Sequence, residues 1–325
     1  MKSRAERVRL AIASRDAPRL ERLIGEGADL SIAPRRGERQ FMTPLMEAAA
    51  DGWAEGCAIL AAASPAGAWG SAGQHALDLA VSARSEGALR ALLAAGGPQG
   101  RAGEAALRSA ASKAPANLVA ALLEAGVDAR APDVFGLDAL SRAMGRIEPE
   151  AAEACARLLA PLADPKARSE RGQGAMWIAA AQGHAGALAA MLPWFAEQAN
   201  EPGNPKPFAS APLPALAAAK SRKAEAFRVL LAPTRWADRV GETEDGGHLS
   251  ALGALWRLAE MDASIWPLVD EAACELGAAE PAAARALEVA TSRKAQLPRL
   301  RAAMEAAEIG AALAGGAGAG SRPRL

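Results

Sequence analysis

A short helical pattern recurs along this chain at intervals of 30 to 40 residues, and this recurrence limits the folds available to it. Its clearest copy is TPLMEAAADG at residues 43–52. Thr43 is a favourable N-cap, Pro44 suits the first position of a helix, and Gly52 suits the residue after its end. Leu45 and the alanines three and four residues later share one helical face. The segment therefore predicts a short helix with a small, apolar face.

Nine segments carry an apolar residue at the place of Leu45, and each is followed by a second apolar pair 13 to 18 residues later. The first set is Leu10, Leu45, Leu77, Leu107, Leu140, Met176, Leu216, Leu252 and Leu287. The second set is Leu23-Ile24, Ile59-Leu60, Leu92-Leu93, Leu122-Leu123, Leu158-Leu159, Met191-Leu192, Leu230-Leu231 and Leu268-Val269, with Leu300 and Met304 in the last segment. Two short helices in about 33 residues predict a repeat array whose units bury each other's apolar faces.

The repeated pattern resembles the ankyrin repeat. Residues 43–53, TPLMEAAADGW, are similar to T-P-L-H-x-A-A-x-x-G-H, and residues 174–192, GAMWIAAAQGHAGALAAML, resemble it more closely. Residues 120–129, AALLEAGVDA, resemble the end of the second ankyrin helix. The resemblance covers about residues 5–310 and implies an all-α fold, an ankyrin-type αα repeat solenoid of about nine helix-pair units. Thr-Pro occurs in only one unit, and an αα array of the tetratricopeptide or HEAT kind is the alternative fold.

We expect a single ankyrin-repeat solenoid over residues 1–310, followed by a Gly-rich, disordered tail over 311–325. The expected units lie near 5–34, 35–66, 67–97, 98–131, 132–167, 168–204, 205–241, 242–279 and 280–310.

Composition excludes several other classes of protein. The chain has no Tyr, and Val and Ile are sparse, so a large β-sheet core has little to form from. Lys+Arg and Asp+Glu are both 37, which argues against nucleic-acid binding because that function favours a basic excess. No signal peptide and no membrane-spanning run are evident. The excess of alanine, and of arginine over lysine, is typical of a bacterial genome rich in G and C.

The sequence predicts no catalytic site, cofactor or metal. Cys57, Cys155 and Cys274 are too far apart for a disulfide framework or a zinc site, which favours a reducing, cytoplasmic location. His184 occupies the place of a structural histidine in the resemblance. No phosphate loop, nucleophile elbow or HExxH motif is present. A repeat array with an undetected enzymatic role is the alternative.

The resemblance implies that a partner protein docks in a groove lined by the loops and the outer ends of the first helices. Counting from the repeat anchors gives the groove candidates Trp53, Lys113, Gln182, Arg222, Lys223 and Arg257, and the loops add Arg35, Arg36, Trp69 and Phe135. From Lys113 onward these candidates are mostly basic, which predicts an acidic partner surface. The alternatives are solvated helix ends for the charged residues and core packing for the aromatic ones.

The expected function is therefore that of a non-enzymatic protein–protein interaction module, a monomer that binds neither nucleic acid nor membrane. By analogy with bacterial ankyrin proteins, it would act as a scaffold, as a toxin-immunity protein, or as an effector secreted into a host cell by a specialised secretion system. Fold-level analogy does not separate these roles.

Overall fold

The structure, a computed structural model, describes residues 4–31, 42–64, 69–71, 74–96, 100–201, 213–234, 239–242, 248–269 and 271. Contacts gather Met1–Ile265 into one compact unit, and the description below concerns that unit. Several expectations from the sequence lie outside the described residues, namely Arg35 and Arg36, Cys274, the ninth helix pair and the 311–325 tail.

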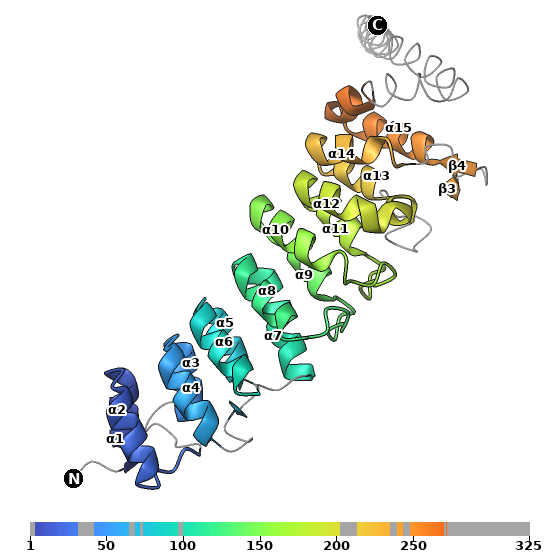
Figure 1. Cartoon of the computed structure of the whole chain (residues 1–325). Helices are drawn as coiled ribbons and strands as arrows, with labels where there is room; N and C mark the ends of the chain where they lie inside the picture. The colour runs from blue at the N-terminus through green and yellow to red at the C-terminus, as the bar shows by residue number, and fades with distance from the viewer. Residues whose placement is uncertain are drawn as a thin grey trace, which may run out of the picture. The chain divides into compact units, whose positions relative to one another are not determined.

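Seven helix pairs follow one another through the described residues (Figure 1), and we number these pairs as units 1 to 7. They are α1 (Arg4–Ala13) with α2 (Ala17–Gly25), α3 (Pro44–Ala50) with α4 (Ala54–Ala63), α5 (Ala76–Ser82) with α6 (Glu86–Ala94), α7 (Arg101–Lys113) with α8 (Ala116–Glu124), α9 (Ala139–Met144) with α10 (Pro149–Leu159), α11 (Ala175–Gln182) with α12 (Ala185–Phe195), and α13 (Pro214–Lys220) with α14 (Ala224–Leu231). The helix α15 (Ala251–Met261) begins an eighth unit.

Short strands and 3₁₀ turns occupy some of the loops between units. The strand β1 (Gly70–Ser71) pairs antiparallel with β2 (Gln74–His75), and β3 (Arg239–Glu242) pairs antiparallel with β4 (His248–Ser250). Single turns of 3₁₀ helix cover Ala196–Asn200 (η2) and Ala263–Ile265 (η3). The predicted repeat solenoid of helix pairs is confirmed, and the hairpins are an addition that the sequence did not predict.

Side-chain caps explain where several helices begin. Oγ1 of Thr43 accepts a hydrogen bond from the Met46 N–H at 3.2 Å, and Pro44 follows it as the first helical residue. Oδ1 of Asp138 accepts in the same way from the Ser141 N–H at 2.8 Å. These bonds satisfy backbone donors that have no partner inside a helix, so the polar residue before each apolar run fixes the start of the helix.

The helices form two layers. Each first helix packs on the first helix of the next unit, from α1 on α3 through α13 on α15, and each second helix packs on the next second helix. The predicted anchors Leu45, Leu77, Leu107 and Leu140 are fully buried between the layers, each burial contributing about 1.5–3 kcal/mol to folding. Fully buried alanines such as Ala179 let neighbouring first helices approach closely.

One predicted anchor is wrong. Leu10 is 37% exposed, whereas Val8 and Ile12 on the same helix are buried. The turn that follows the helix sets the register: Arg15 has a left-handed backbone (φ 51°), as Gly52 has in the next unit (φ 63°). Val8 precedes Arg15 by as many residues as Leu45 precedes Gly52, so Val8 is the true equivalent of Leu45.

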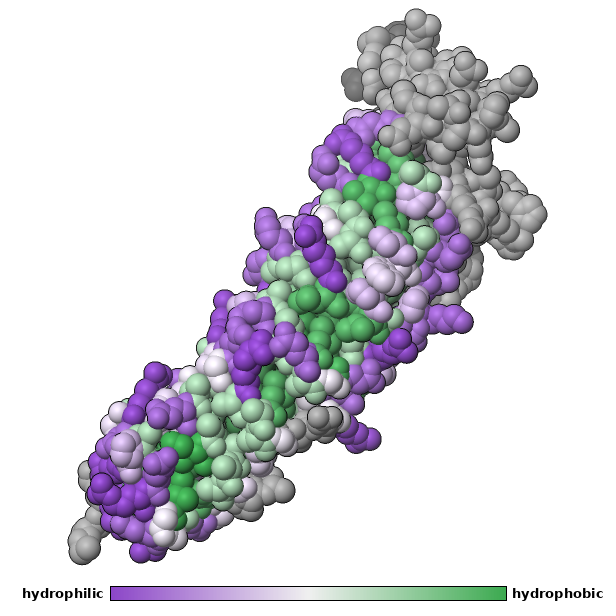
Figure 2. Space-filling view, viewed as in Figure 1, coloured by the Kyte–Doolittle hydropathy of each residue, from purple (hydrophilic) through white to green (hydrophobic). Residues whose placement is uncertain are grey.

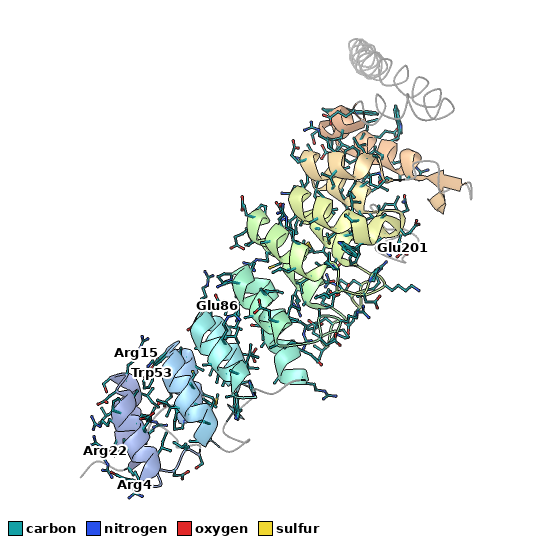
Figure 3. All side chains as sticks on the ribbon, in the orientation of Figure 1. Arg4, Arg15, Arg22, Trp53, Glu86 and Glu201 are labelled. Atoms are coloured by element: carbon teal, nitrogen blue, oxygen red, sulfur yellow. The ribbon has the colours of Figure 1, made fainter. Side chains whose placement is uncertain are left out.

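Every first helix begins at a loop and ends in a short turn that leads into its second helix. The stack therefore has a loop edge, where the units are joined, and a turn edge on the opposite side. A left-handed residue marks five of the turns, namely Arg15, Gly52, Arg84, Gly183 and Arg222. Figure 3 shows Arg15 beside Trp53 at the turn edge of the first two units, where Nη2 of Arg15 donates to the Asp51 carbonyl at 2.8 Å.

Candidate functional site

The structure divides the predicted partner-binding residues between the two edges. Trp53, Lys113, Gln182, Arg222 and Lys223 lie at or beside turns, so they belong to the turn edge. In contrast, Trp69 and Phe135 lie in loops, and Arg257 lies within α15. These residues do not form one continuous surface, because a whole first helix separates the two edges.

Two of the predicted aromatic contacts are part of the core. Trp53 is 6% exposed, and its ring lies so close to Gly56 that a Cβ there would come within 2.0 Å of it. Trp69 is 9% exposed and stacks on His75 with ring centroids 6.3 Å apart. Core packing, the alternative reading for the aromatic residues, therefore holds for both tryptophans, and a partner has little access to either ring.

A recess lies on the first helices of units 4, 5 and 6, and we call it the central hollow. It has a volume of about 300 Å³. Its walls include Ser112 of α7, Arg142 of α9, Gly145 directly after α9, and Trp177, Ile178, Ala181 and Gln182 of α11. The loops before α9 and α11 add Leu137 and Gln173. The hollow thus combines apolar walls with amide and hydroxyl groups, the composition that suits the side chain of a bound partner.

Gly145 leaves one wall of the hollow without a side chain. A Cβ built on Gly145 would meet only the Arg142 carbonyl at 3.5 Å and the Ser141 carbonyl at 4.0 Å, which are ordinary contacts. Its backbone is not left-handed (φ −79°). A side chain at this position would therefore fill the hollow without disturbing the helix.

The loop before α9 carries an exposed apolar tip. Val134 is 83% exposed and Phe135 is 55% exposed. Oδ1 of Asp133 accepts hydrogen bonds from the N–H groups of Phe135 at 2.8 Å and Leu137 at 3.0 Å, which holds the loop in one conformation. Burial alone would raise the pKa of Asp133, but hydrogen bonds from Leu137 and Arg142 lower it overall. Nε of Arg142 donates to Oδ2 of Asp133 at 2.7 Å, with the guanidinium 5.9 Å from the Phe135 ring centroid.

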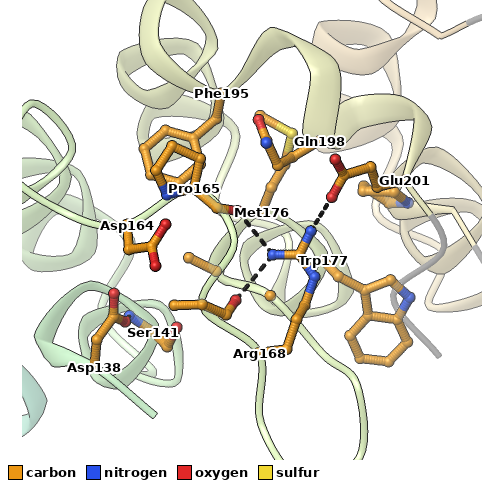
Figure 4. Close-up of a pocket in the computed structure, with 14 residues that line it drawn as sticks. Asp138, Ser141, Asp164, Pro165, Arg168, Met176, Trp177, Phe195, Gln198 and Glu201 are labelled. Carbon is orange, nitrogen blue, oxygen red and sulfur yellow. Dashed lines mark hydrogen bonds and ion pairs between the residues drawn. The ribbon is translucent and has the colours of Figure 1, made fainter. Parts of the chain in front are cut away.

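A small cavity adjoins the hollow and is drawn in Figure 4. Its volume is about 10 Å³, close to the space that one water molecule occupies, and Ser141 and Trp177 line both spaces. Nη1 of Arg168 donates to the carbonyls of Pro165 at 2.8 Å and Ala167 at 2.9 Å, and Nη2 forms an ion pair with Glu201. These contacts fix the loop that presents Gln173 to the hollow.

Basic side chains stand at the two ends of the hollow on the turn edge. Lys113 is exposed and follows Ser112, which lines the hollow. Lys223 is exposed, and its side chain lies across Gly183, so that a Cβ there would be 2.7 Å from Cδ of Lys223. Arg222 is engaged differently: its Nε and Nη2 donate to Oδ2 of Asp262 at 2.9 and 2.6 Å.

Sequence reasoning placed Gln182 at this site but missed Trp177, Ile178 and Gly145. Trp177 carried a signal, since it occupies the place of the ankyrin histidine with a large apolar side chain. Trp177 and Ile178 are only partly buried, and partly exposed large side chains on a first helix mark a surface that can hold a partner.

The thiols of Cys57 and Cys155 are free and buried, and burial raises the pKa of Cys57 to about 12, which suits a packing residue rather than a nucleophile. Among the described residues no group of three or more His, Cys, Asp or Glu side chains could hold a metal ion. None of the described helices has the length and apolar character needed to cross a bilayer.

No protein-family model and no curated protein sequence matches the chain. Among solved structures, the ankyrin repeat domain of Bcl-3, described as a unique member of the IkappaB protein family, has 24% sequence identity and a TM-score of 0.54. That match covers 69% of this chain and 97% of the Bcl-3 domain. An ankyrin repeat domain from Acinetobacter baumannii has 21% identity and a TM-score of 0.48, over 57% of this chain and 95% of that one. The fold of the described helix pairs is thus the one predicted from the repeated pattern.

Proposed function

We propose that this chain, which has the ankyrin-repeat fold, is a non-enzymatic module that binds another protein through the central hollow. The observation that carries the proposal is the hollow itself, about 300 Å³ of space on three consecutive first helices. An apolar wall of Trp177 and Ile178 offers burial to a partner side chain, and Gln173 and Gln182 offer hydrogen bonds at its rim. Buried aromatic anchors of this kind contribute most of the energy at protein interfaces.

The partner that fits this site has an acidic surface. Lys113, Lys223 and Arg257 are exposed, and no ion pair joins them to a described carboxylate. An acidic surface would gain both speed of association and specificity from these groups. Phe135 at the loop edge is a further contact that a large partner could reach. Arg35 and Arg36 remain candidates from the sequence alone.

The test compares three forms of the full chain. In Gly145→Leu the new side chain fills the hollow, while Gly25→Leu, at the exposed end of α2 with nothing within 4 Å of its Cβ, is the matched control. Each form is immobilised on a resin and incubated with an extract of its native cells. The proteins that each resin retains are then quantified by mass spectrometry. We expect at least one protein to be retained by the unmodified chain and by Gly25→Leu but not by Gly145→Leu.

Circular dichroism would first establish that the two glycine variants fold alike. The partner that is lost would then be purified and titrated by calorimetry, where Gly145→Leu should weaken binding at least about tenfold. Identical retained proteins in all three forms would contradict the proposal.

For the biological setting we propose a toxin-immunity or effector role, in which the chain acts as a monomer by binding its partner. The free thiols of Cys57 and Cys155 support a proposed cytoplasmic location, where thiols stay reduced. If a toxin is among the proteins that no longer bind Gly145→Leu, this result would support the toxin-immunity role. Transfer of the chain into host cells by a secretion system would support the effector role.

A further inference from the structure

The two ends of the central hollow carry the same charge. Ser112 and Gln182 are the lining residues farthest apart along the stack, in units 4 and 6. Lys113 directly follows Ser112, and the side chain of Lys223 lies over Gly183, the neighbour of Gln182. The apolar wall of Trp177 and Ile178 belongs to α11 of unit 6, the helix that ends at Gln182.

The charges of both lysines are available to a partner. Nζ of Lys113 donates only to the hydroxyl of Ser82 at 3.3 Å, and the nearby Asp78 is half-buried. Lys223 has no ion pair with any described carboxylate. By contrast, Arg142 inside the hollow is held by Asp133, so the positive charge that a partner meets is concentrated at the two ends.

The spacing of the units sets the length of extended peptide that can reach both lysines. Neighbouring packed helices lie about 8–10 Å apart. Nζ of Lys113 contacts Ser82 of unit 3, and the side chain of Lys223 lies over unit 6, so the two charges are three units, or about 24–30 Å, apart. An extended peptide advances about 3.3 Å per residue. Carboxylates that reach both lysines would therefore be about seven to nine residues apart, and the side chain midway between them would enter the hollow.

We infer that the central hollow binds an extended peptide segment of the partner, in which a large apolar residue lies between two acidic residues about seven to nine positions apart. The inference rests on the proposed function and specifies its partner. The apolar side chain fills the space beside Trp177, and the flanking carboxylates pair with Lys113 and Lys223.

The experiment selects peptides of twelve random residues displayed on phage against the full chain, with Gly145→Leu as the counter-selection. We expect the enriched peptides to carry the acidic, apolar, acidic pattern at this spacing. The best peptide is then titrated by fluorescence anisotropy. Its affinity should fall at least about tenfold for Gly145→Leu, for the double variant Lys113→Glu with Lys223→Glu, and for a peptide whose central residue is alanine.

A charge exchange separates direct contact from an indirect effect on folding. The double lysine-to-glutamate variant should bind the same peptide with its two acidic residues replaced by lysine, with affinity restored to within about threefold. Gly25→Leu should bind as the unmodified chain does.

Enrichment of basic or uncharged peptides, no enrichment, or failure of the exchanged pair to bind would overturn the inference. The proposed function would survive each of these results if a protein in the cell extract binds the unmodified chain but not Gly145→Leu. If no partner depends on the hollow, both proposals fail together.

Discussion

Three turns contain an arginine where the backbone conformation favours glycine. Arg15, Arg84 and Arg222 have φ of 51°, 53° and 59°, a left-handed conformation that costs most residues about 1–2 kcal/mol. Each side chain bonds the next unit: Arg15 to the Asp51 carbonyl, Arg84 to the Lys113 carbonyl at 3.3 Å, and Arg222 to the Asp262 carboxylate. The bond to the next unit offsets the strain in the turn.

His184 shows how one buried residue couples folding to pH. Its Nε2 lies 2.9 Å from the Arg146 carbonyl, so Nε2 must carry the proton, and Nδ1 is buried without a partner. Burial is the main cause that lowers the pKa of His184 below its usual 6.5. Protonation of Nδ1 is thus unfavourable in the folded chain.

We predict that the free energy of unfolding decreases as the pH falls from 7 through 6.5 and toward the lowered pKa of His184. In this window the unfolded chain binds a proton that the folded chain does not, so acid favours unfolding. Urea titrations at a series of pH values would measure the slope. His184→Gln should reduce it, while the similarly lowered pKa of His75 leaves a remainder. Equal slopes for both chains would contradict the assignment.

At the scale of elements, hydrogen bonds join the turns into what we call the turn ladder. Besides the three arginines, Oγ of Ser85 donates to the Gly52 carbonyl at 2.9 Å. Nη1 of Arg146 donates to the carbonyls of Ala111 at 3.1 Å and Ala114 at 2.7 Å, at the end of α7. These bonds satisfy carbonyls that have no partner within their own helix. The ends of the first helices are therefore fixed by side chains of a neighbouring unit.

We predict that Arg146→Met destabilises the chain by about 2–3 kcal/mol, because it leaves two buried carbonyls without their charged donor. Urea unfolding followed by circular dichroism would measure the change. The control is Glu148→Gln, since Glu148 is 66% exposed and 3.7 Å from Nε of Arg146; its effect should stay below about 1 kcal/mol. A loss equally small for Arg146→Met would show that the ladder contributes little.

The sequence allowed the helices to be predicted better than the surfaces they form. Caps and apolar spacing are local, so Thr43 and Leu45 could be placed from their neighbours alone. The register of α1 could not, because Val8, Leu10 and Ile12 are all apolar and the turn at Arg15 decides between them. The hollow depends on which side chains of α9 and α11 face each other, and this follows only from the packing of separate units.

At the scale of the molecule, the main packing contacts among the described helices join neighbouring units. The second helix α8 packs on α6 and α10, and α7 packs on α5 and α9. The stability of such a stack is close to the sum of its units and of the interfaces between them. If a unit in the middle is destabilised, the units on its two sides lose the interface that couples their unfolding.

We predict that Leu122→Ala, at a fully buried position of α8, costs about 2–5 kcal/mol through the cavity that it leaves. Because units on either side can then unfold separately, the urea transition should also become broader. Leu162→Ala, at a position 45% exposed, is the control and should change stability by no more than about 1 kcal/mol. A sharp transition in Leu122→Ala would indicate that the stack unfolds as one body.

The central hollow has walls from units 4, 5 and 6, although units 4 and 6 are separated by unit 5. A guest that fills it would connect α7 and α11, each of which packs on α9. Local opening of units 4 to 6 would become slower. The amide protons of α7, α9 and α11 would then exchange with solvent more slowly than the amide protons of the units at either end of the stack. Occupancy would then be measurable as slower amide exchange along the whole of these three helices, including residues that do not line the hollow.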